Sequence, residues 1–269
     1  MIKCFDWPIG VCSWSLGNDF DKIAASGASC VHLAIAPALG ENGDDYLARV
    51  ADSNLAISAT MINFAQEDYS TLESIKTTGG IVPDDCWWEN RQTSLKAIEL
   101  TDELAVRYLS MHFGFIELRD TAKARKLIER TKMLADKAGE HNVTLLMETG
   151  QESAQELREF LEKLNQPALG VNFDPANMIL YDKGNPIEAV GVLAPWIKHV
   201  HIKDALRTKK PGEWGTEVVW GTGEVNASEF LKALKRVKYN GALAVEREAG
   251  DDRFGDIKSA VDKLKIFKD

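Results

Sequence analysis

Three carboxylates and one imidazole stand where four apolar runs of the sequence end. They are Glu148 in VTLLMETG, Asp174 in LGVNFDPAN, His201 in IKHVHIKD and Glu246 in ALAVEREAG. Oxygen ligands with a single imidazole suit a hard or borderline divalent ion, with Mn²⁺ or Mg²⁺ favoured and Co²⁺ or Zn²⁺ acceptable. One carboxylate at a strand end is more often a helix cap or the partner of a surface lysine. Four together favour one divalent metal ion, because buried like charges repel unless protons or a cation neutralise them.

The four residues share one phase of their strands. In the run before Asp174, the large apolar side chains of Leu169, Val171 and Phe173 alternate with small or polar ones, and Asp174 continues the second set. Successive side chains of a strand point to opposite faces. If the strands are parallel and closed into a ring, the apolar phase meets an outer layer of helices. The four acidic and imidazole groups then point to the axis and converge.

Short apolar, β-branched runs alternate with helical patterns from one end of the sequence to the other. Eight runs lie near residues 9–15, 30–36, 55–62, 108–114, 143–149, 168–174, 197–203 and 241–247. Amphipathic segments such as 121–141 and 228–240 lie between them. Eight such units predict an α/β fold, a (β/α)8 TIM barrel, built as a single domain over residues 1–269. A doubly wound open sheet is the alternative, but GTGEVN at 221–226 lacks the third glycine of a dinucleotide-binding loop.

Two connections are longer than a βα turn requires. Residues 65–90 follow the third run and residues 205–225 follow the seventh. In a barrel both lie on the C-terminal face, where active sites are built, and long loops there are often lids or substrate walls. These loops carry Trp87, Trp88, Trp214 and Trp220. We expect these tryptophans either to stack against a sugar ring or to pack the loops onto the barrel.

The charge and the apolar pattern exclude several partners. The sequence has 41 acidic and 32 basic residues and a net charge of −9. Because nucleic-acid-binding proteins normally present a basic face, no nucleic-acid partner is expected. The sequence has no run of about 18 apolar residues that could span a membrane, and its first residues do not resemble a signal peptide. We therefore expect a cytoplasmic protein with its four cysteines reduced and no membrane partner; the sequence leaves homo-oligomer formation open.

Five motifs carry a family resemblance over essentially the whole chain. They are Glu148 after the fifth run, DPAN at 174–177, HVHIKD at 199–204, GTGEV at 221–225 and VERE at 245–248. In this order they resemble the xylose isomerase-like TIM barrel superfamily, and more narrowly its sugar phosphate isomerase/epimerase group. The resemblance implies that Glu148, Asp174, His201 and Glu246 are the metal ligands. It also implies that the two glutamates are the catalytic acid/base pair, and that Arg207 contacts the substrate.

The sequence departs from the family at positions that contact substrate. Thr149 and Gly150 follow the ligand glutamate where many relatives carry Asn-His, and Asn177 stands where several have a second histidine. His32 replaces a glutamate that often ends the second strand. We therefore expect Asn177 and His32 to bear on substrate identity.

The expected reaction is a proton transfer on a small carbohydrate. A metal-bound carbonyl acidifies the neighbouring C–H, and an enediolate forms. Return of the proton by Glu148 or Glu246 gives epimerisation or aldose–ketose isomerisation. Loss of a β-leaving group from a keto-glycoside or keto-inositol would instead make the enzyme a lyase or dehydratase. His112, Lys203 and Trp14 share the inward phase or the mouth of the predicted barrel, so we expect them in the substrate pocket.

Two further hypotheses fit less well. An endonuclease IV-like repair enzyme shares the barrel but needs a zinc cluster with many histidines, whereas this chain has five histidines and an acidic balance. A non-catalytic sugar-binding barrel would be expected to have lost one of the four ligands, and all four are present. The hypothesis of a metal-dependent sugar isomerase or epimerase is therefore preferred.

Overall fold

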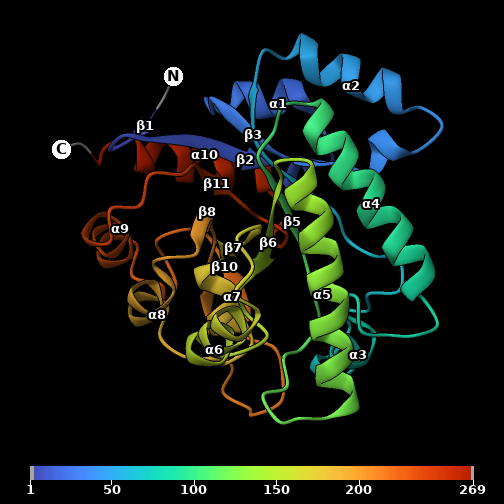
Figure 1. Cartoon of the computed structure of the whole chain (residues 1–269). Helices are drawn as coiled ribbons and strands as arrows, with labels where there is room; N and C mark the ends of the chain where they lie inside the picture. Colours follow the sequence, from blue (N-terminus) through green and yellow to red (C-terminus); the bar gives the residue numbers. More distant parts are fainter. Residues whose placement is uncertain (1–2, 268–269) are drawn as a thin grey trace.

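Eight parallel strands close into a barrel at the centre of the molecule (Figure 1). The computed structural model describes residues 3–267. The strands are β2 (Trp7–Cys12), β3 (Cys30–Ala34), β4 (Ala56–Met61), β5 (Tyr108–Met111), β6 (Thr144–Glu148), β7 (Leu169–Phe173), β8 (Ile197–Ile202) and β11 (Leu243–Val245). The ring closes because β2 pairs in parallel with both β3 and β11. A short strand, β1 (Lys3–Cys4), pairs antiparallel with β2. The predicted (β/α)8 barrel is confirmed.

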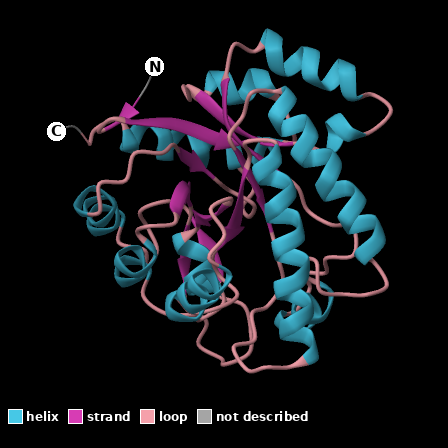
Figure 2. Cartoon of the chain, viewed as in Figure 1, coloured by secondary structure: helices cyan, strands magenta, loops and turns pink. Residues whose placement is uncertain are grey.

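The helices form a layer around the strands (Figure 2). They are α1 (Phe20–Ala25), α2 (Gly43–Asp52), α3 (Leu72–Thr78), α4 (Trp87–Glu103), α5 (Ala122–Glu140), α6 (Ala154–Leu164), α7 (Pro175–Leu180), α8 (Pro186–Leu193), α9 (Ala227–Arg236) and α10 (Arg253–Leu264). Two 3₁₀ turns, η1 (Ser13–Leu16) and η2 (Ala36–Leu39), follow β2 and β3. The prediction of helix to residue 240 was too long, because α9 ends at Arg236 and Lys238 adopts a left-handed φ of 57°.

The apolar phase of the strands makes the core between barrel and helices. Val171 and Phe173 of β7 are fully buried, and Phe173 stacks on Phe230 of α9 with ring centroids 5.8 Å apart. The opposite phase points into the barrel and is unusually polar. Its buried members include Asn172 and His199, which are paired in register across β7 and β8. The barrel axis is therefore lined by groups that need hydrogen-bond partners.

Both long connections contain regular structure. The first holds α3, and the second forms a hairpin of β9 (Asp204–Leu206) and β10 (Thr216–Val218). Asp204 is fully buried and organises the second connection. Its carboxylate accepts backbone N–H groups of Gly221 at 2.9 Å, Gly223 at 3.0 Å and Val225 at 3.0 Å. One side chain thus fixes the return of the chain from the hairpin to α9.

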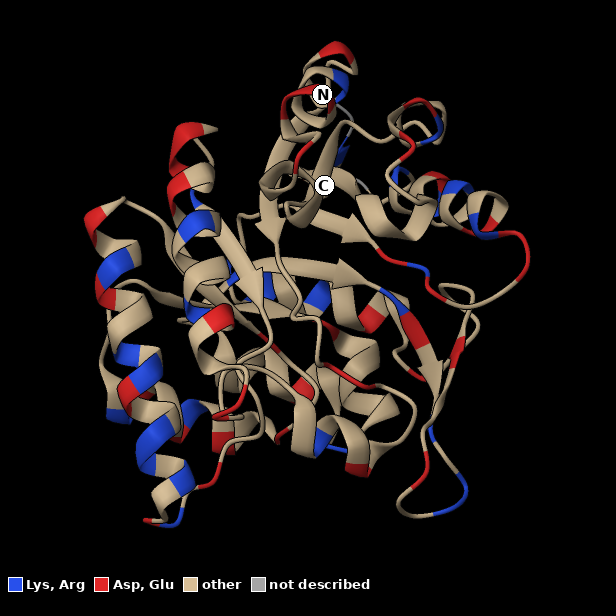
Figure 3. Ribbon diagram, turned by 90° about the vertical axis from the view of Figure 1, so that its right-hand side faces the viewer, with Lys and Arg blue, Asp and Glu red and all other residues tan. Residues whose placement is uncertain are grey.

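The outer surface carries charges of both signs. Figure 3 shows basic and acidic residues interspersed along the outer helices on that side of the molecule. Among residues 3–267, none of the helices combines the length and the apolar character that crossing a membrane requires.

The role of Asp204 can be tested by stability. We expect Asp204→Ala to lower the free energy of unfolding by about 3 kcal/mol, because it leaves several buried N–H donors without an acceptor. Chemical denaturation followed by circular dichroism measures the change. The control is Glu213→Ala, which removes an exposed ion pair with Lys210 and should cost less than about 1 kcal/mol. Equal effects of the two substitutions would contradict the assignment.

Candidate functional site

The four acidic and imidazole residues meet at one end of the barrel. Glu148 is the last residue of β6, and His201 is the fifth residue of β8. Asp174 follows β7 directly and caps α7, while Glu246 follows β11 directly. Since parallel strands end on the same face, these residues converge there. One ligand atom from each lies within 4.8 Å of the others, and all four residues are buried.

His201 stands at the centre of this cluster. Its Nδ1 lies 3.3 Å from Glu148 Oε1, 3.6 Å from Asp174 Oδ2 and 3.4 Å from Glu246 Oε2. Three carboxylates therefore surround one buried ring nitrogen. Burial alone would lower the pKa of His201, but the negative charges around it outweigh burial and raise the pKa well above its usual value.

Several atoms of the cluster have no hydrogen-bond partner. Within the described chain, Glu148 Oε2, Asp174 Oδ2 and His201 Nδ1 are buried and unpaired. Buried polar atoms are normally satisfied, so unpaired atoms in one cluster require an explanation. A divalent cation supplies one, since carboxylate oxygens and an imidazole are its preferred ligands. The residues present therefore fit a metal ion.

One oxygen of each carboxylate is held by a hydrogen bond from the protein. Asn177 Nδ2 donates to Glu148 Oε1 at 3.0 Å, and Trp14 Nε1 donates to Glu246 Oε1 at 2.7 Å. Asp174 Oδ1 accepts two backbone N–H groups at the start of α7, at 2.8 and 3.0 Å. These bonds fix the orientation of the carboxylates, and they leave one oxygen of Asp174 and one of Glu148 free to face a ligand.

Lys203 supplies a positive charge next to the cluster. Its Nζ lies 2.9 Å from Glu246 Oε2, 2.7 Å from Glu248 Oε2 and 3.9 Å from Asp174 Oδ2. Burial alone would raise the pKa of Glu246, but Lys203 and His201 hold this pKa well below its usual range. For Asp174, burial is the stronger effect and raises the pKa above its usual value. Neighbouring carboxylates thus have different proton affinities because their cation contacts differ.

A cavity of about 740 Å³ opens above the cluster. Its apolar and aromatic walls come from Trp14, Met61, Tyr69, Tyr181 and Trp214. Polar groups at its floor include His112, Glu148, Asn177, Lys203 and Glu246. Aromatic walls with a few convergent polar groups are typical of small-molecule sites, and this volume suits a small carbohydrate.

The cavity contains four of the six side chains that we predicted to contact substrate. Trp14, His112, Asn177 and Lys203 line it. His112 Nε2 lies 3.8 Å from Glu148 Oε2, and His112 Nδ1 is buried without a partner among residues 3–267. His112 is thus placed to donate to a bound molecule.

The structure does not place His32 or Arg207 at the cavity. His32 is fully buried behind His201, one level deeper in the barrel, with its Nδ1 2.9 Å from His201 Nε2. Arg207 lies beside the hairpin, where it pairs with Asp182 and donates to the carbonyl of Gly184 at 3.1 Å. A nearby carboxylate and carbonyl hold the guanidinium outside the cavity, so the expectation of substrate contact has no support from its position.

Only one of the four loop tryptophans reaches the cavity. Trp214 lines it, whereas Trp220 packs in the core against Phe230, with centroids 6.3 Å apart. Trp87 lies under the guanidinium of Arg130 on the outer surface, and Trp88 is 68% exposed. Packing of the loops onto the barrel therefore accounts for Trp220, and neither Trp87 nor Trp88 contributes to the cavity.

Some cavity residues were missed in the sequence. Tyr69 and Tyr181 line the cavity, as does Asn63, two residues beyond the end of β4. Asn63 lies just beyond the end of a strand, as the residues of the acidic cluster do, so the same reasoning would have identified it. Tyr69 lies in the long connection after β4. The sequence pointed to this connection as a possible part of the site but did not single out Tyr69. Tyr181 follows α7, and no local pattern distinguishes it from a core tyrosine.

Comparisons with known proteins agree with this architecture. A family model described as Xylose isomerase-like TIM barrel matches residues 20–267. The chain is 30% identical to a xylose isomerase domain protein from Planctomyces limnophilus, with a TM-score of 0.90 and 97% of each chain covered. A stretch of 82 residues, 30% of this chain and 25% of the relative, is 37% identical to the uncharacterized protein YihM of Escherichia coli.

More distant solved structures share the fold alone. A xylose isomerase-like TIM barrel protein from Mycobacterium smegmatis, solved with magnesium, is 18% identical with a TM-score of 0.77, covering 99% of this chain and 98% of that one. D-Psicose 3-epimerase from Clostridium cellulolyticum, solved with D-tagatose, is 14% identical with a TM-score of 0.71, covering 97% and 100%.

The charge balance of the cluster predicts a pH-dependent loss of stability in a lysine variant. We expect Lys203→Met in metal-free buffer to lower the free energy of unfolding at pH 7 by about 3–5 kcal/mol, the usual cost of leaving a buried charge unpaired. The pKa of Glu246 is lower in the folded protein than in the unfolded protein. Ionised Glu246 therefore stabilises the wild-type fold above the ordinary Glu pKa, and this contribution is lost as the pH falls through the pKa of Glu246 in the folded protein. The difference between variant and wild type should therefore shrink below about pH 4.5.

Urea denaturation at several pH values measures this difference. Lys210→Met, at an exposed lysine of the hairpin loop, is the control and should change stability by less than about 1 kcal/mol. A constant deficit for Lys203→Met from pH 7 to well below pH 4.5 would mean that the lysine acts through packing and not through charge.

Proposed function

The chain belongs to the xylose isomerase-like TIM barrel family, and we propose that it is a divalent-metal-dependent isomerase or epimerase of a keto- or aldo-sugar or a sugar derivative. One observation carries the proposal. Unpaired buried atoms of Glu148, Asp174 and His201 meet at the floor of a cavity of carbohydrate size. A site that only binds sugar needs no such concentration of uncompensated acidic groups, which costs stability.

The residues that would hold the ion are Glu148, Asp174, His201 and Glu246. Their donor set favours one Mn²⁺ or Mg²⁺ over Co²⁺ or Zn²⁺. When bound, such an ion acts as a Lewis acid that polarises a substrate carbonyl and makes the adjacent C–H more acidic. The magnesium in the related M. smegmatis structure supports this choice. The whole chain, residues 1–269, is proposed to work as one domain on a small carbohydrate.

The two glutamates differ in how free they are to move a proton. Glu148 Oε2 is unpaired within residues 3–267, whereas Glu246 accepts from Trp14 at 2.7 Å and from Lys203 at 2.9 Å. A carboxylate with two strong donors is a weak base, so we assign removal of the proton to Glu148. Glu246 returns a proton that it first takes up from solvent, and Glu148 later releases its proton to solvent, so the two transfers balance.

The positions of the two glutamates suit transfer at different faces of a substrate. Their strands, β6 and β11, are separated in the barrel by β7 and β8. A ring or chain lying between them would expose opposite faces to the two carboxylates. Removal from one face and return to the other gives epimerisation, and return to the neighbouring carbon gives isomerisation.

Other cavity residues would orient the substrate. The faces of Trp14, Tyr69 and Trp214 suit the apolar side of a sugar, while Asn177 and His112 can bind hydroxyl groups. Lys203 lies close enough to the acidic cluster to stabilise negative charge that develops on the substrate. The D-tagatose bound to the related psicose epimerase supports a ketose or a similar molecule as substrate.

The metal site can be tested by titration. We expect isothermal titration calorimetry to detect about one Mn²⁺ per chain, and Asp174→Asn to weaken binding more than about 100-fold, since loss of an outer-shell partner alone typically costs 10- to 100-fold. The asparagine keeps an oxygen for the cap of α7 but replaces the unpaired oxygen. Asp182→Asn, at an exposed aspartate, should bind as wild type does. Absence of Mn²⁺ uptake by the wild-type protein would refute the proposed function.

The proton transfer can be followed by exchange with solvent. We expect the Mn²⁺-loaded enzyme in D₂O to place deuterium next to the carbonyl of its substrate, screened over a panel of ketoses and keto-glycosides by NMR. Glu148→Gln should reduce this exchange about 10²- to 10⁴-fold, the usual value of a general base. The control is Glu224→Gln, a surface position beside Arg207, which should exchange at the wild-type rate.

Two outcomes would change the assignment. Full exchange by Glu148→Gln together with loss of exchange in Glu246→Gln would transfer the base role to Glu246. A released group with a new double bond in the product would replace the isomerase by a lyase or dehydratase acting through the same proton abstraction.

A further inference from the structure

His201 can serve as a metal ligand only if its Nδ1 carries a lone pair. A neutral imidazole has one N–H and one lone pair, so the partner of the other nitrogen decides which is which. The Nδ1 of His201 faces the carboxylates, as described above. Its Nε2 points the other way, into the barrel, 2.9 Å from His32 Nδ1 and 3.1 Å from the amide of Asn172.

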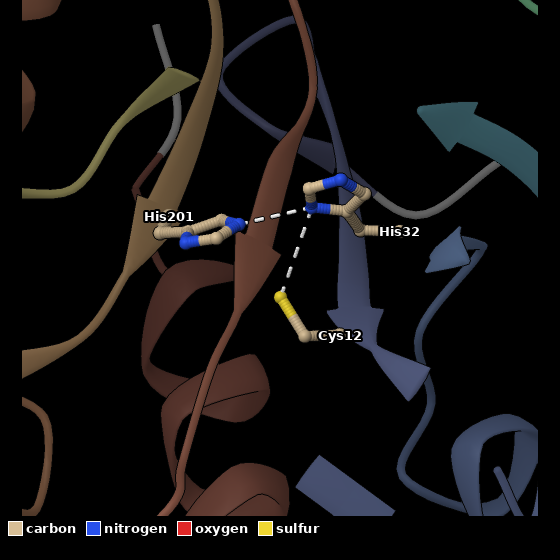
Figure 4. A group of neighbouring side chains, drawn as sticks. All are labelled: Cys12, His32 and His201. Carbon is tan, nitrogen blue, oxygen red and sulfur yellow. Dashed lines mark hydrogen bonds between the residues drawn. The ribbon is translucent and has the colours of Figure 1, made fainter. Parts of the chain in front are cut away.

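His32 is held in one tautomer by a backbone carbonyl. Its Nε2 lies 3.2 Å from the oxygen of Thr60, which can only accept, so Nε2 must carry the hydrogen. Among the described residues no carboxylate lies within hydrogen-bond distance of His32, so a positive charge on this fully buried ring would be uncompensated, and the ring is neutral. The Nδ1 of His32 is then a lone pair that faces His201 (Figure 4). The hydrogen between the two rings must belong to His201 Nε2.

The rest of the polar layer can satisfy the same assignment. The structure places Asn172 Nδ2 3.1 Å from His201 Nε2 and Asn172 Oδ1 2.9 Å from His199 Nδ1. A hydrogen on His201 Nε2 requires this amide to be turned by 180°, so that its oxygen accepts from His201 and its NH₂ donates to His199 Nδ1; oxygen and nitrogen of an amide are assigned from the surrounding network. His199 Nε2 then donates to Ser58 Oγ at 3.1 Å, and Ser58 donates to the carbonyl of Val31 at 3.1 Å. The side chains of His32, Asn172, His199 and Ser58 then each have a hydrogen-bond partner.

Hydrogen bonding explains the histidine pair better than a second metal site does. Cys12 Sγ lies 4.0 Å from His32 Nδ1, and Cys12, His32 and His201 form a compact group (Figure 4). Two nitrogens bound at about 2.0–2.1 Å to one tetrahedral zinc lie roughly 3.3 Å apart, whereas these lie 2.9 Å apart.

We propose that His32 is a positioning residue: anchored by the Thr60 carbonyl, it accepts the Nε2 hydrogen of His201, so that Nδ1 is the nitrogen that gives up its proton and offers a lone pair to a cation in the acidic cluster. The inference rests on the proposed function, because it assigns the lone pair to a metal ion. His32 therefore acts on the metal through His201 and never contacts substrate.

The test measures metal affinity and not turnover. His32→Phe keeps a ring of similar size but removes the acceptor, and it should weaken Mn²⁺ binding about 10- to 100-fold. His32→Gln can still offer an amide oxygen to His201 and should restore part of the loss. Cys12→Ala should bind Mn²⁺ as wild type does. Competition with a fluorescent chelator gives the dissociation constants, and circular dichroism verifies the fold of each variant.

A second measurement uses the wild-type protein and does not depend on any variant folding. Long-range ¹H–¹⁵N correlation spectra of histidine-labelled protein distinguish the tautomers, and we expect His32 to carry its hydrogen on Nε2. A hydrogen on Nδ1 would overturn the inference, as would wild-type Mn²⁺ affinity in a folded His32→Phe protein.

The remaining outcomes separate this inference from the proposed function. A Co²⁺ complex with a thiolate-to-metal absorption band that Cys12→Ala abolishes would place the ion among Cys12, His32 and His201 and would overturn the inference. A wild-type protein that binds no Mn²⁺ would refute the proposed function, whereas the His32 tautomer would still decide whether His32 fixes the ring of His201.

Discussion

Three carboxylates share one buried end of this barrel, and the need to neutralise them governs what lies around them. Glu148, Asp174 and Glu246 are each less than a tenth exposed, so solvent cannot screen their repulsion. The protein supplies Lys203 on one side and His201 at the centre. Two cationic groups do not use all the carboxylate oxygens, since Glu148 Oε2 and Asp174 Oδ2 have no hydrogen-bond partner within the described chain. The site is thus built incomplete, in a way that a divalent cation would complete.

Such a site is stable only because the rest of the barrel compensates. The outward phase of the strands and the inward faces of the helices form a continuous apolar core, and burial of that surface stabilises the fold. The side chains that point into the barrel are polar near the acidic cluster. A buried polar side chain without a hydrogen-bond partner there would lower the stability of the fold by about 1–3 kcal/mol. His199, Asn172 and His32 avoid this cost by bonding to one another and to backbone carbonyls. The polar network therefore positions the site, while the apolar layer supplies the stability.

The fold and the acidic cluster were accessible from the sequence because both depend on local periodicity. Alternation along a strand fixes which side chains point inward, and the parallel arrangement brings strand ends to one face. The positions of His32 and Arg207 depend on information that periodicity does not contain. The level of His32 within the barrel is set by the stagger between strands, which pairs it with Cys12 and Ala59. The direction of Arg207 is set by Asp182, a residue 25 positions earlier in the sequence.

His201 joins two environments of opposite character. Its Nδ1 belongs to the acidic layer, where negative charge raises the pKa, and its Nε2 belongs to the layer of His32 and His199, where burial keeps both rings neutral. A charged residue in place of His32 would bring a second uncompensated charge into the barrel, and an apolar one would leave the Nε2 hydrogen of His201 with only the amide of Asn172. A neutral acceptor held by a backbone carbonyl meets both conditions. The histidine in the middle of β3 thus follows from the same charge constraint that created the acidic cluster above it.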